Sequence, residues 1–272
     1  MDFEIKSIGV GNGTNRYLVF GSGSRPFVMI PGLSINSPLD SAGAVAKAYS
    51  AFARDYRVIL IDRRDEPEEG CDIASLSEDV RAVMDAENAR GAYVFGVSQG
   101  GMIAQELAVA HPGYVSRLAL ASTLSAVNET AERVITNWAT LASEGRTEEL
   151  TLDFIGKVYS EGFAGRYGRF LAEMNKKLKR SQLDRFVRLA LAGKDFDVSE
   201  RLKEIKCPCL VLAGENDAVT TAAAAEKTAC LLGCRCVILP GYCHAVYDEA
   251  PEFKDILLSF GREGDMECDT TL

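Results

Sequence analysis

One short segment near the middle of the chain constrains its fold more than any other. Residues 96–101 read Gly-Val-Ser-Gln-Gly-Gly, which places Ser98 in a Gly-x-Ser-x-Gly pattern. The four residues before Gly96 are apolar and rich in strand formers, and residues 102–110 have helical spacing. A strand, a sharp turn and a helix, with a serine at the turn, form a nucleophile elbow that presents the hydroxyl at the end of a sheet. Only small residues fit beside so strained a turn, which accounts for the flanking glycines.

Strand and helix patterns alternate along most of the chain. Short apolar runs typical of buried strands occur at residues 26–30, 56–61, 92–95, 115–121 and 209–213. Buried strands separated by helices predict a mainly parallel sheet that is covered on both faces. Two strand candidates on either side of Gly11-Asn12-Gly13 predict a hairpin near the start of the chain. The sequence Ser75-Leu-Ser-Glu78 is typical of a capping box, so we expect a helix to begin there.

This alternation is interrupted between residues 125 and 203. Apolar residues in that segment recur at helical spacing, and no convincing strand pattern occurs. The segment therefore predicts a helical insertion, after which the strand pattern resumes at Cys209. Residues 263–272 are polar and acidic, and we expect them to form a flexible tail.

Composition excludes several classes of function. The 272 residues carry a net charge of −9, whereas a nucleic-acid-binding protein usually presents a basic face. No apolar run approaches the roughly 18 residues that a membrane span needs, and residues 1–4 show no secretory signal. We therefore expect a cytoplasmic protein with neither nucleic acid nor membrane as a partner.

The eight cysteines have three interpretations: disulfides, a metal site or reduced thiols. Several of them lie inside apolar runs, and the chain is large, which favours reduced thiols in a cytosolic protein. Cys230, Cys234 and Cys236 are closely spaced, but their spacing matches no zinc pattern. We predict no metal and no cofactor.

Ser98 needs a base, and the chain contains only two histidines. A serine hydroxyl is a weak nucleophile until a base takes its proton, and an acid must orient that base. His111 ends the helix that follows the elbow, where a local role at the helix terminus is expected. His244 follows the last predicted strand, at the carboxyl edge where parallel sheets build their sites. His244 is therefore the predicted base.

The acid is expected between the serine and the histidine in the sequence, because that is the order Ser, Asp/Glu, His. Residues 214–219 follow a predicted strand and contain Glu215 and Asp217. Asp217 is the favoured candidate and Glu215 is the alternative. A turn or helix-capping aspartate is the other interpretation of Asp217.

An oxyanion formed by serine attack requires backbone N–H donors. The residue after the nucleophile, Gln99, is expected to supply one. The loop after the strand at 26–30 reads Pro31-Gly32-Leu33, and the Leu33 N–H is the expected second donor. The alternative is that Gly32 marks only a tight turn.

These three motifs together resemble the α/β-hydrolase superfamily over nearly the whole chain. The elbow and its helix, the acid loop Gly214–Val219 and the histidine loop Gly241–His244 occur in the order typical of that family. The resemblance implies an α/β fold with a mostly parallel, eight-stranded sheet flanked by helices and an all-helical cap insertion. It divides the chain into a core at 1–124 and 204–262, a cap at 125–203 and a tail at 263–272.

Two departures from the family pattern stand out. The family often has His-Gly after its third strand, where this chain has Pro31-Gly32. It often has a glycine-rich turn after its fourth strand, where this chain has the acidic segment Asp62–Gly70. The first departure predicts an oxyanion loop of different shape, and the second is interpreted as a solvated loop or an altered rim of the site.

The resemblance implies a carboxylesterase-like serine hydrolase that cleaves a small carboxylic ester or thioester. Ser98, Asp217 and His244 are the expected catalytic residues, and a small-molecule acyl compound is the expected partner. Hydrolysis or lysis of a C–C bond and cofactor-free haloperoxidase chemistry are alternatives on the same residues. A ligand receptor with slow turnover is the alternative from another class.

Specificity is expected to lie in the insertion. Trp138, Tyr159, Phe163 and Phe170 are candidates to line an apolar substrate pocket, with ordinary helix packing as the other interpretation. The basic run at residues 176–180 is interpreted as a solvated helix face or a contact for an anionic substrate. The sequence identifies neither the acyl group nor the oligomeric state, for which a homodimer is one option.

Overall fold

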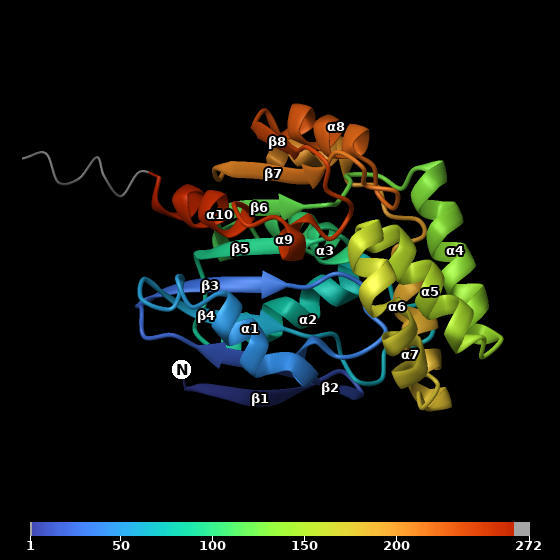
Figure 1. The fold of residues 1–272 in the computed structure, drawn as a ribbon. Coiled ribbons are helices and arrows are strands. Elements are labelled where there is room, and N and C mark those ends of the chain that lie inside the picture. Colours follow the sequence, from blue (N-terminus) through green and yellow to red (C-terminus); the bar gives the residue numbers. More distant parts are fainter. Residues whose placement is uncertain (1, 264–272) are drawn as a thin grey trace, which may run out of the picture.

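The structure is a computed structural model that describes residues 2–263. A single sheet of eight strands forms its centre, in the order β1-β2-β4-β3-β5-β6-β7-β8 (Figure 1). The strands are β1 (Phe3–Val10), β2 (Gly13–Phe20), β3 (Arg25–Ile30), β4 (Tyr56–Ile61), β5 (Ala92–Val97), β6 (Val115–Ala121), β7 (Cys209–Gly214) and β8 (Arg235–Leu239). Strand β2 pairs antiparallel with β1 and β4, and every other pairing is parallel. The predicted fold class and the hairpin around Gly11 are confirmed.

Among the described residues, ten α-helices surround the sheet or extend from it. They are α1 (Ala42–Ala48), α2 (Ile73–Ala86), α3 (Gln99–Ala110), α4 (Glu129–Ser143), α5 (Thr147–Val158), α6 (Glu161–Asn175), α7 (Arg180–Leu191), α8 (Ala222–Leu232), α9 (Val246–Glu249) and α10 (Phe253–Arg262). Within residues 2–263, no helix combines the length and the apolar composition that crossing a bilayer requires.

Alternate residues of the strands build two separate cores, because neighbouring side chains in a strand point to opposite faces. On one face, Val28 and the other buried strand residues that point the same way pack against α2, α3 and α8. On the other face, Phe27 and the buried strand residues that point the same way as Phe27 pack against α1 and α10. Both faces of the sheet are therefore covered, as a mainly parallel sheet requires.

Helices α4 to α7 lie between β6 and β7 and stand beyond the carboxyl ends of the strands (Figure 1). They enclose a third apolar cluster, which includes Trp138 and Phe186. An antiparallel bridge between Ala126 and Asp197 joins the two ends of this insertion. That the insertion acts as a separate cap domain with bounds at 125 and 203 stays a prediction.

The start of α2 differs from the prediction. The helix begins at Ile73, and its cap is Asp72, whose side chain accepts a hydrogen bond from the Ser75 N–H at 2.8 Å. Ser75 Oγ in turn accepts from the Asp72 N–H at 3.1 Å, so Ser75 is the second partner of the capping box rather than its first. The predicted box between Ser75 and Glu78 is wrong.

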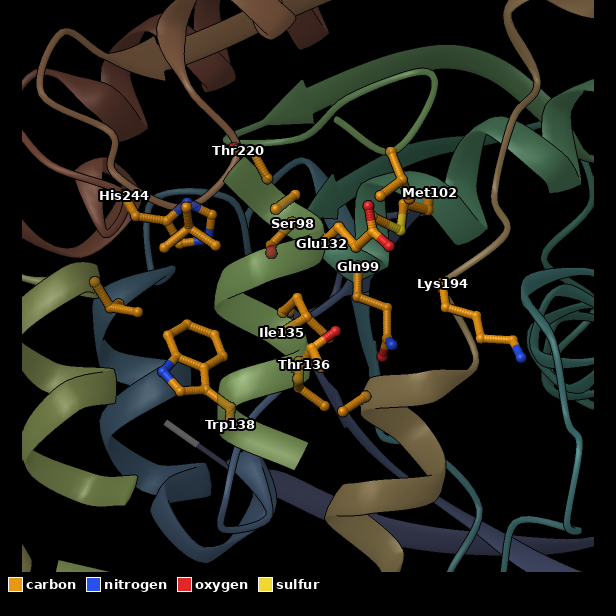
Figure 2. Close-up of a pocket in the computed structure, with 18 of the residues that line it drawn as sticks. Ser98, Gln99, Met102, Glu132, Ile135, Thr136, Trp138, Lys194, Thr220 and His244 are labelled. Carbon is orange, nitrogen blue, oxygen red and sulfur yellow. The ribbon is translucent and has the colours of Figure 1, made fainter. Parts of the chain in front are cut away.

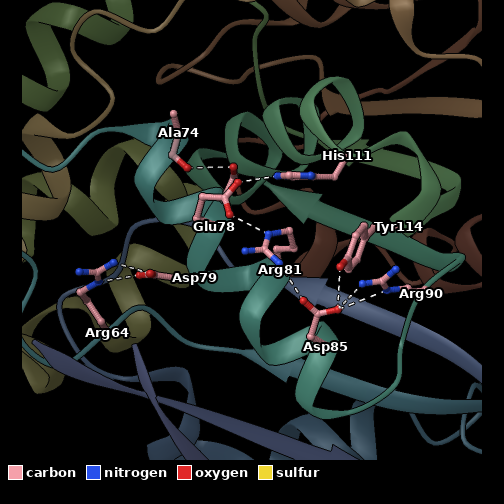
Figure 3. A network of polar contacts seen from close by, with 10 residues as sticks. Arg64, Ala74, Glu78, Asp79, Arg81, Asp85, Arg90, His111 and Tyr114 are labelled. Atoms are coloured by element: carbon pink, nitrogen blue, oxygen red, sulfur yellow. Dashed lines mark hydrogen bonds and ion pairs between the residues drawn. The ribbon is translucent and has the colours of Figure 1, made fainter. Parts of the chain in front are cut away.

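Glu78 has other partners, on the outer side of α2. It pairs with His111 and accepts a hydrogen bond from Arg81 at 2.7 Å (Figure 3). His111 therefore belongs to a surface network between α2 and the end of α3. The same view shows the buried ion pair between Arg64 and Asp79, which joins the segment after β4 to α2.

The cysteines from Cys71 to Cys243 are free thiols, and Cys268 lies outside the described residues. So does the predicted flexible tail, apart from Glu263.

Phe27 is the centre of the aromatic core on the α1 and α10 face. Its side chain is fully buried, with ring centroids 4.8 Å from Phe52 and 4.7 Å from Tyr93. We expect Phe27→Ala to lower the free energy of unfolding by about 3–5 kcal/mol, because the cavity left cannot collapse. Urea denaturation measures this. The control is Phe3→Ala, at a ring that is 45% exposed; equal urea midpoints for the two variants would contradict the assignment of the core.

Candidate active site

Ser98 lies at the sharp turn between β5 and α3. Its backbone has φ 51° and ψ −121°, a strained conformation for a residue with a side chain. The turn is held by close backbone contacts: a Cβ on Gly96 would lie 2.4 Å from the Gly100 carbonyl oxygen, and one on Gly100 would lie 2.0 Å from that of Ile30. Glycine is therefore required at both positions, and the serine projects beyond the carboxyl edge of the sheet.

His244 follows β8 and approaches the same edge. It is only 4% exposed, and its Nδ1 lies 2.9 Å from both carboxylate oxygens of Asp217. A carboxylate on Nδ1 fixes the tautomer of the ring and leaves Nε2 for another partner. Figure 2 shows His244 and Ser98 facing the same cavity.

Asp217 is held as a buried anion. Burial, the largest single influence, would raise the pKa of its carboxyl group, but contact with His244 and hydrogen bonds from Val219 and Thr220 together outweigh it and hold this pKa well below its usual range. The Val219 N–H and the Thr220 hydroxyl add hydrogen bonds, each of 2.8 Å. The group is therefore ionised at neutral pH and suited to stabilise a positive charge on His244.

The alternative acid, Glu215, lies elsewhere. Its side chain is exposed and accepts a hydrogen bond from the Gly241 N–H at 2.9 Å. It therefore fastens the loop that leads to His244, whereas Asp217 contacts the ring itself.

The loop after β3 touches the nucleophile. A Cβ on Gly32 would lie 3.1 Å from Ser98 Cβ and 3.8 Å from its Oγ. Leu33 and Gln99, which sequence analysis singled out as oxyanion donors, both line the cavity that contains Ser98. The structure thus brings the two peptide segments and the serine hydroxyl together.

The cavity is small and mostly apolar. The space open to the centre of a water-sized sphere is about 60 Å³. Among the described residues, its only carboxylate and amine side chains are those of Glu132 and Lys194, and both are exposed at the rim. Figure 2 shows His244 and Lys194 on opposite sides of the view. Apolar lining side chains include Leu33, Met102, Ile135, Trp138, Phe154, Val158 and Val219.

Of the four predicted pocket residues, only Trp138 lines this cavity, and Phe170 is 64% exposed. Tyr159 and Phe163 stack on each other instead, with ring centroids 4.1 Å apart, at the junction of α5 and α6. The Tyr159 hydroxyl bonds Asp248 at 3.2 Å, which orients the ring toward α9. The basic run at residues 176–180 also lies outside the lining.

Three polar side chains that sequence analysis missed support the site. The Thr220 hydroxyl donates a hydrogen bond to the Asp217 carboxylate. Ser122 Oγ donates to the His244 carbonyl oxygen at 2.7 Å. Thr123 Oγ1 donates to the Ser98 carbonyl oxygen at 2.7 Å. The spacing Asp-x-x-Thr is a local signal for Thr220, since such residues commonly bond across a turn. The other two contacts join distant segments and leave no local pattern.

Comparisons with known proteins agree with the observed fold. A family model described as the alpha/beta hydrolase fold matches residues 25–251. The chain is 26% identical to 3-oxoadipate enol-lactonase 2 of Acinetobacter baylyi over 215 aligned residues. The alignment covers 76% of this chain and 77% of that protein.

Two solved structures have the same fold at low sequence identity. The enol-lactonase from Burkholderia xenovorans LB400 has a TM-score of 0.82 at 22% identity, covering 95% of this chain and 100% of that one. An alpha/beta hydrolase enzyme from a Medee basin deep-sea metagenome library has a TM-score of 0.84 at 20% identity, covering 94% and 97%.

The ionised state of Asp217 predicts a pH-dependent share of stability. Because its pKa is lower in the folded chain than in the unfolded chain, the stabilisation is complete above the unfolded value of about 4 and is lost as the pH falls toward the folded value. We expect Asp217→Asn to lower the free energy of unfolding by about 3–5 kcal/mol at pH 7. Urea denaturation should show this difference shrinking below about pH 4; a difference independent of pH would contradict it.

Proposed function

Because this chain belongs to the α/β-hydrolase family, we propose that it is a serine hydrolase that cleaves a small, uncharged carboxylic ester, lactone or thioester. One observation carries the proposal: Ser98 and His244, whose ring is held by Asp217, face one cavity that Leu33 and Gln99 also line. An activated nucleophile beside N–H donors is the arrangement that acyl transfer requires.

In the proposed reaction, Ser98 Oγ attacks the acyl carbon while His244 Nε2 takes the hydroxyl proton. Asp217 stabilises the imidazolium that results. The Leu33 and Gln99 N–H groups bind the oxyanion, each contributing a factor of about 10²–10³ in rate. His244 returns the proton to the leaving group, and a water molecule, activated by the same histidine, releases the acid from the acyl-enzyme.

The character of the cavity supports a neutral and compact acyl group. Its interior around Ser98 is lined by aliphatic and aromatic side chains, and its two rim charges are exposed. Burying a carboxylate there without a partner would cost several kcal/mol. An intramolecular ester is compatible with these dimensions, and the enol-lactonase names of the relatives support lactones as a subclass to test. Because 3-oxoadipate is a dicarboxylic acid, its enol-lactone keeps one free carboxylate; the lactone proposed for this chain differs in carrying no charge.

Ser98→Ala should abolish labelling by a fluorophosphonate probe and lower kcat for p-nitrophenyl butyrate by about 10³-fold or more, because the nucleophile is removed. Gel fluorescence and steady-state kinetics measure both effects. Ser143→Ala, at an exposed serine of α4, is the matched control and should retain both. Labelling of Ser98→Ala equal to that of the unmodified chain would exclude the proposed nucleophile.

The same experiment separates an enzyme from a receptor. Labelling at Ser98 without turnover of any ester, thioester or lactone would favour a ligand receptor that keeps the three residues but does not complete the reaction.

The apolar interior also predicts discrimination against acyl charge. We expect kcat/KM for monomethyl succinate to be at least about 100-fold lower than for methyl butyrate, because the carboxylate would lose its hydration without gaining a partner. Titration of released acid measures both rates. Comparable rates that fall in Lys194→Ala for the succinate alone would show that Lys194 binds the carboxylate, and would contradict the proposed substrate class.

A further inference from the structure

Arg63, the second residue after β4, is a buried cation with few partners. Its side chain is only 5% exposed. Nη2 donates a hydrogen bond to the Pro31 carbonyl oxygen, whereas Nε and Nη1 have no partner among the described residues. A guanidinium carries five N–H donors, so this one is largely committed to a single backbone oxygen.

That oxygen belongs to the loop beside the nucleophile. Pro31 directly precedes Gly32, which touches Ser98, and Leu33, the proposed oxyanion donor. The Pro31 carbonyl oxygen also abuts the start of α3, since a Cβ on Gly100 would lie 2.5 Å from it. The Arg63 hydrogen bond therefore ends on a peptide group packed between the oxyanion loop and the elbow.

Arg63 is costly for stability alone. Burial lowers the pKa of its guanidinium to about 10, although the nearby Asp62 opposes this, so the group is still charged at neutral pH. An apolar side chain of similar volume commonly stabilises such a site as well or better. Residues that violate the rules of core composition are typical of functional positions.

The backbone of Arg63 is itself held from both sides. Its N–H donates to Asp62 Oδ1 at 2.7 Å, and its carbonyl oxygen accepts from Arg185 Nη2 of α7 at 2.8 Å. Arg185 Nε also donates to the Arg64 carbonyl oxygen at 3.0 Å. The guanidinium is thus presented from a fixed segment and not from a mobile loop.

We propose that Arg63 is a positioning residue of the oxyanion hole: it holds the Pro31 carbonyl oxygen away from the reacting centre, so that the following N–H groups stay directed at the oxyanion. The inference rests on the proposed function. If the Pro31–Gly32 peptide rotated, its carbonyl oxygen would approach the developing negative charge and repel it. The family often has a histidine at the position of Pro31, and a proline offers no side-chain donor; here the donor comes from the neighbouring strand end.

The test compares Arg63→Met with Arg64→Met. Both remove a buried arginine beside the end of β4, but Arg64 binds Asp79 on α2 and does not contact the loop. For Arg63→Met we expect kcat for p-nitrophenyl butyrate to fall by about 10–100-fold with KM changed by less than about three-fold. Arg64→Met should lower thermal stability and leave kcat of the folded fraction within about three-fold of the unmodified chain.

A second readout isolates the oxyanion. A short-chain alkyl trifluoromethyl ketone accepts Ser98 Oγ at its carbonyl carbon, with the proton passing to His244, and leaves an oxyanion in the hole. Its inhibition constant should rise in Arg63→Met by about the same factor as kcat falls, whereas that of butan-1-ol, a neutral ligand that forms no oxyanion, should be unchanged. Should Arg63→Met fail to fold, Arg63→Leu, which likewise has no side-chain donor, is measured in the same way.

The outcomes distinguish the two proposals. Unchanged kcat and ketone affinity in a folded Arg63 variant, with the unmodified chain active, would overturn the role of Arg63 alone. Equal losses of ketone and butan-1-ol binding would indicate general damage to the pocket and would also overturn it. An unmodified chain that neither reacts with fluorophosphonate nor cleaves esters would instead overturn the proposed function.

Discussion

The site depends on how closely two backbones approach at the end of β5. The start of α3 lies against the last residue of β3 with so little space that a methyl group at Gly100 would overlap the Ile30 carbonyl oxygen. This contact forces Ser98 into its positive φ and brings Gly32 against the serine side chain. The strain at the elbow and the proximity of the oxyanion loop are consequences of one packing constraint, because neither segment can withdraw without opening the core beneath it.

Much of the candidate site was predictable because its signals are local. The glycines around Ser98, and the strand ends that precede Asp217 and His244, each occupy only a few consecutive residues. Parallel strands present their carboxyl ends at one edge, so residues after separate strands converge there whatever the intervening chain does. To choose between Asp217 and Glu215, the sequence lacked only the information on which carboxylate points inward. The structure supplies it, because Asp217 lies 2.9 Å from His244 Nδ1.

Other features were not predictable, for physical reasons. Helical periodicity identifies a buried face but not what it faces, so Trp138 in the cavity and the stacked pair of Tyr159 and Phe163 have the same pattern. The start of α2 was misplaced because Ser75 suits both positions of a capping box, and the extended backbone of Asp72 decides between them. The contact between Arg63 and Pro31 joins two strand ends, and no spacing in one sequence encodes it.

The insertion is anchored to the core at the two places where the proposed chemistry is most sensitive. Gln99 Nε2 donates a hydrogen bond to the Leu189 carbonyl oxygen, near the end of α7, at 2.5 Å. The N–H of Ala245, the residue after His244, donates to the Val158 carbonyl oxygen at the end of α5 at 2.7 Å. Both bonds join a residue of the site to a helix end, where carbonyl groups lack partners within the helix. On the proposed function, the core supplies the reacting groups and the insertion sets the room left beside them. A displacement of α7 or α5 is then transmitted to Gln99, or to the segment that carries His244, through a single hydrogen bond in each case. Substitutions in the insertion that alter size selectivity should therefore also alter the rate of the reaction.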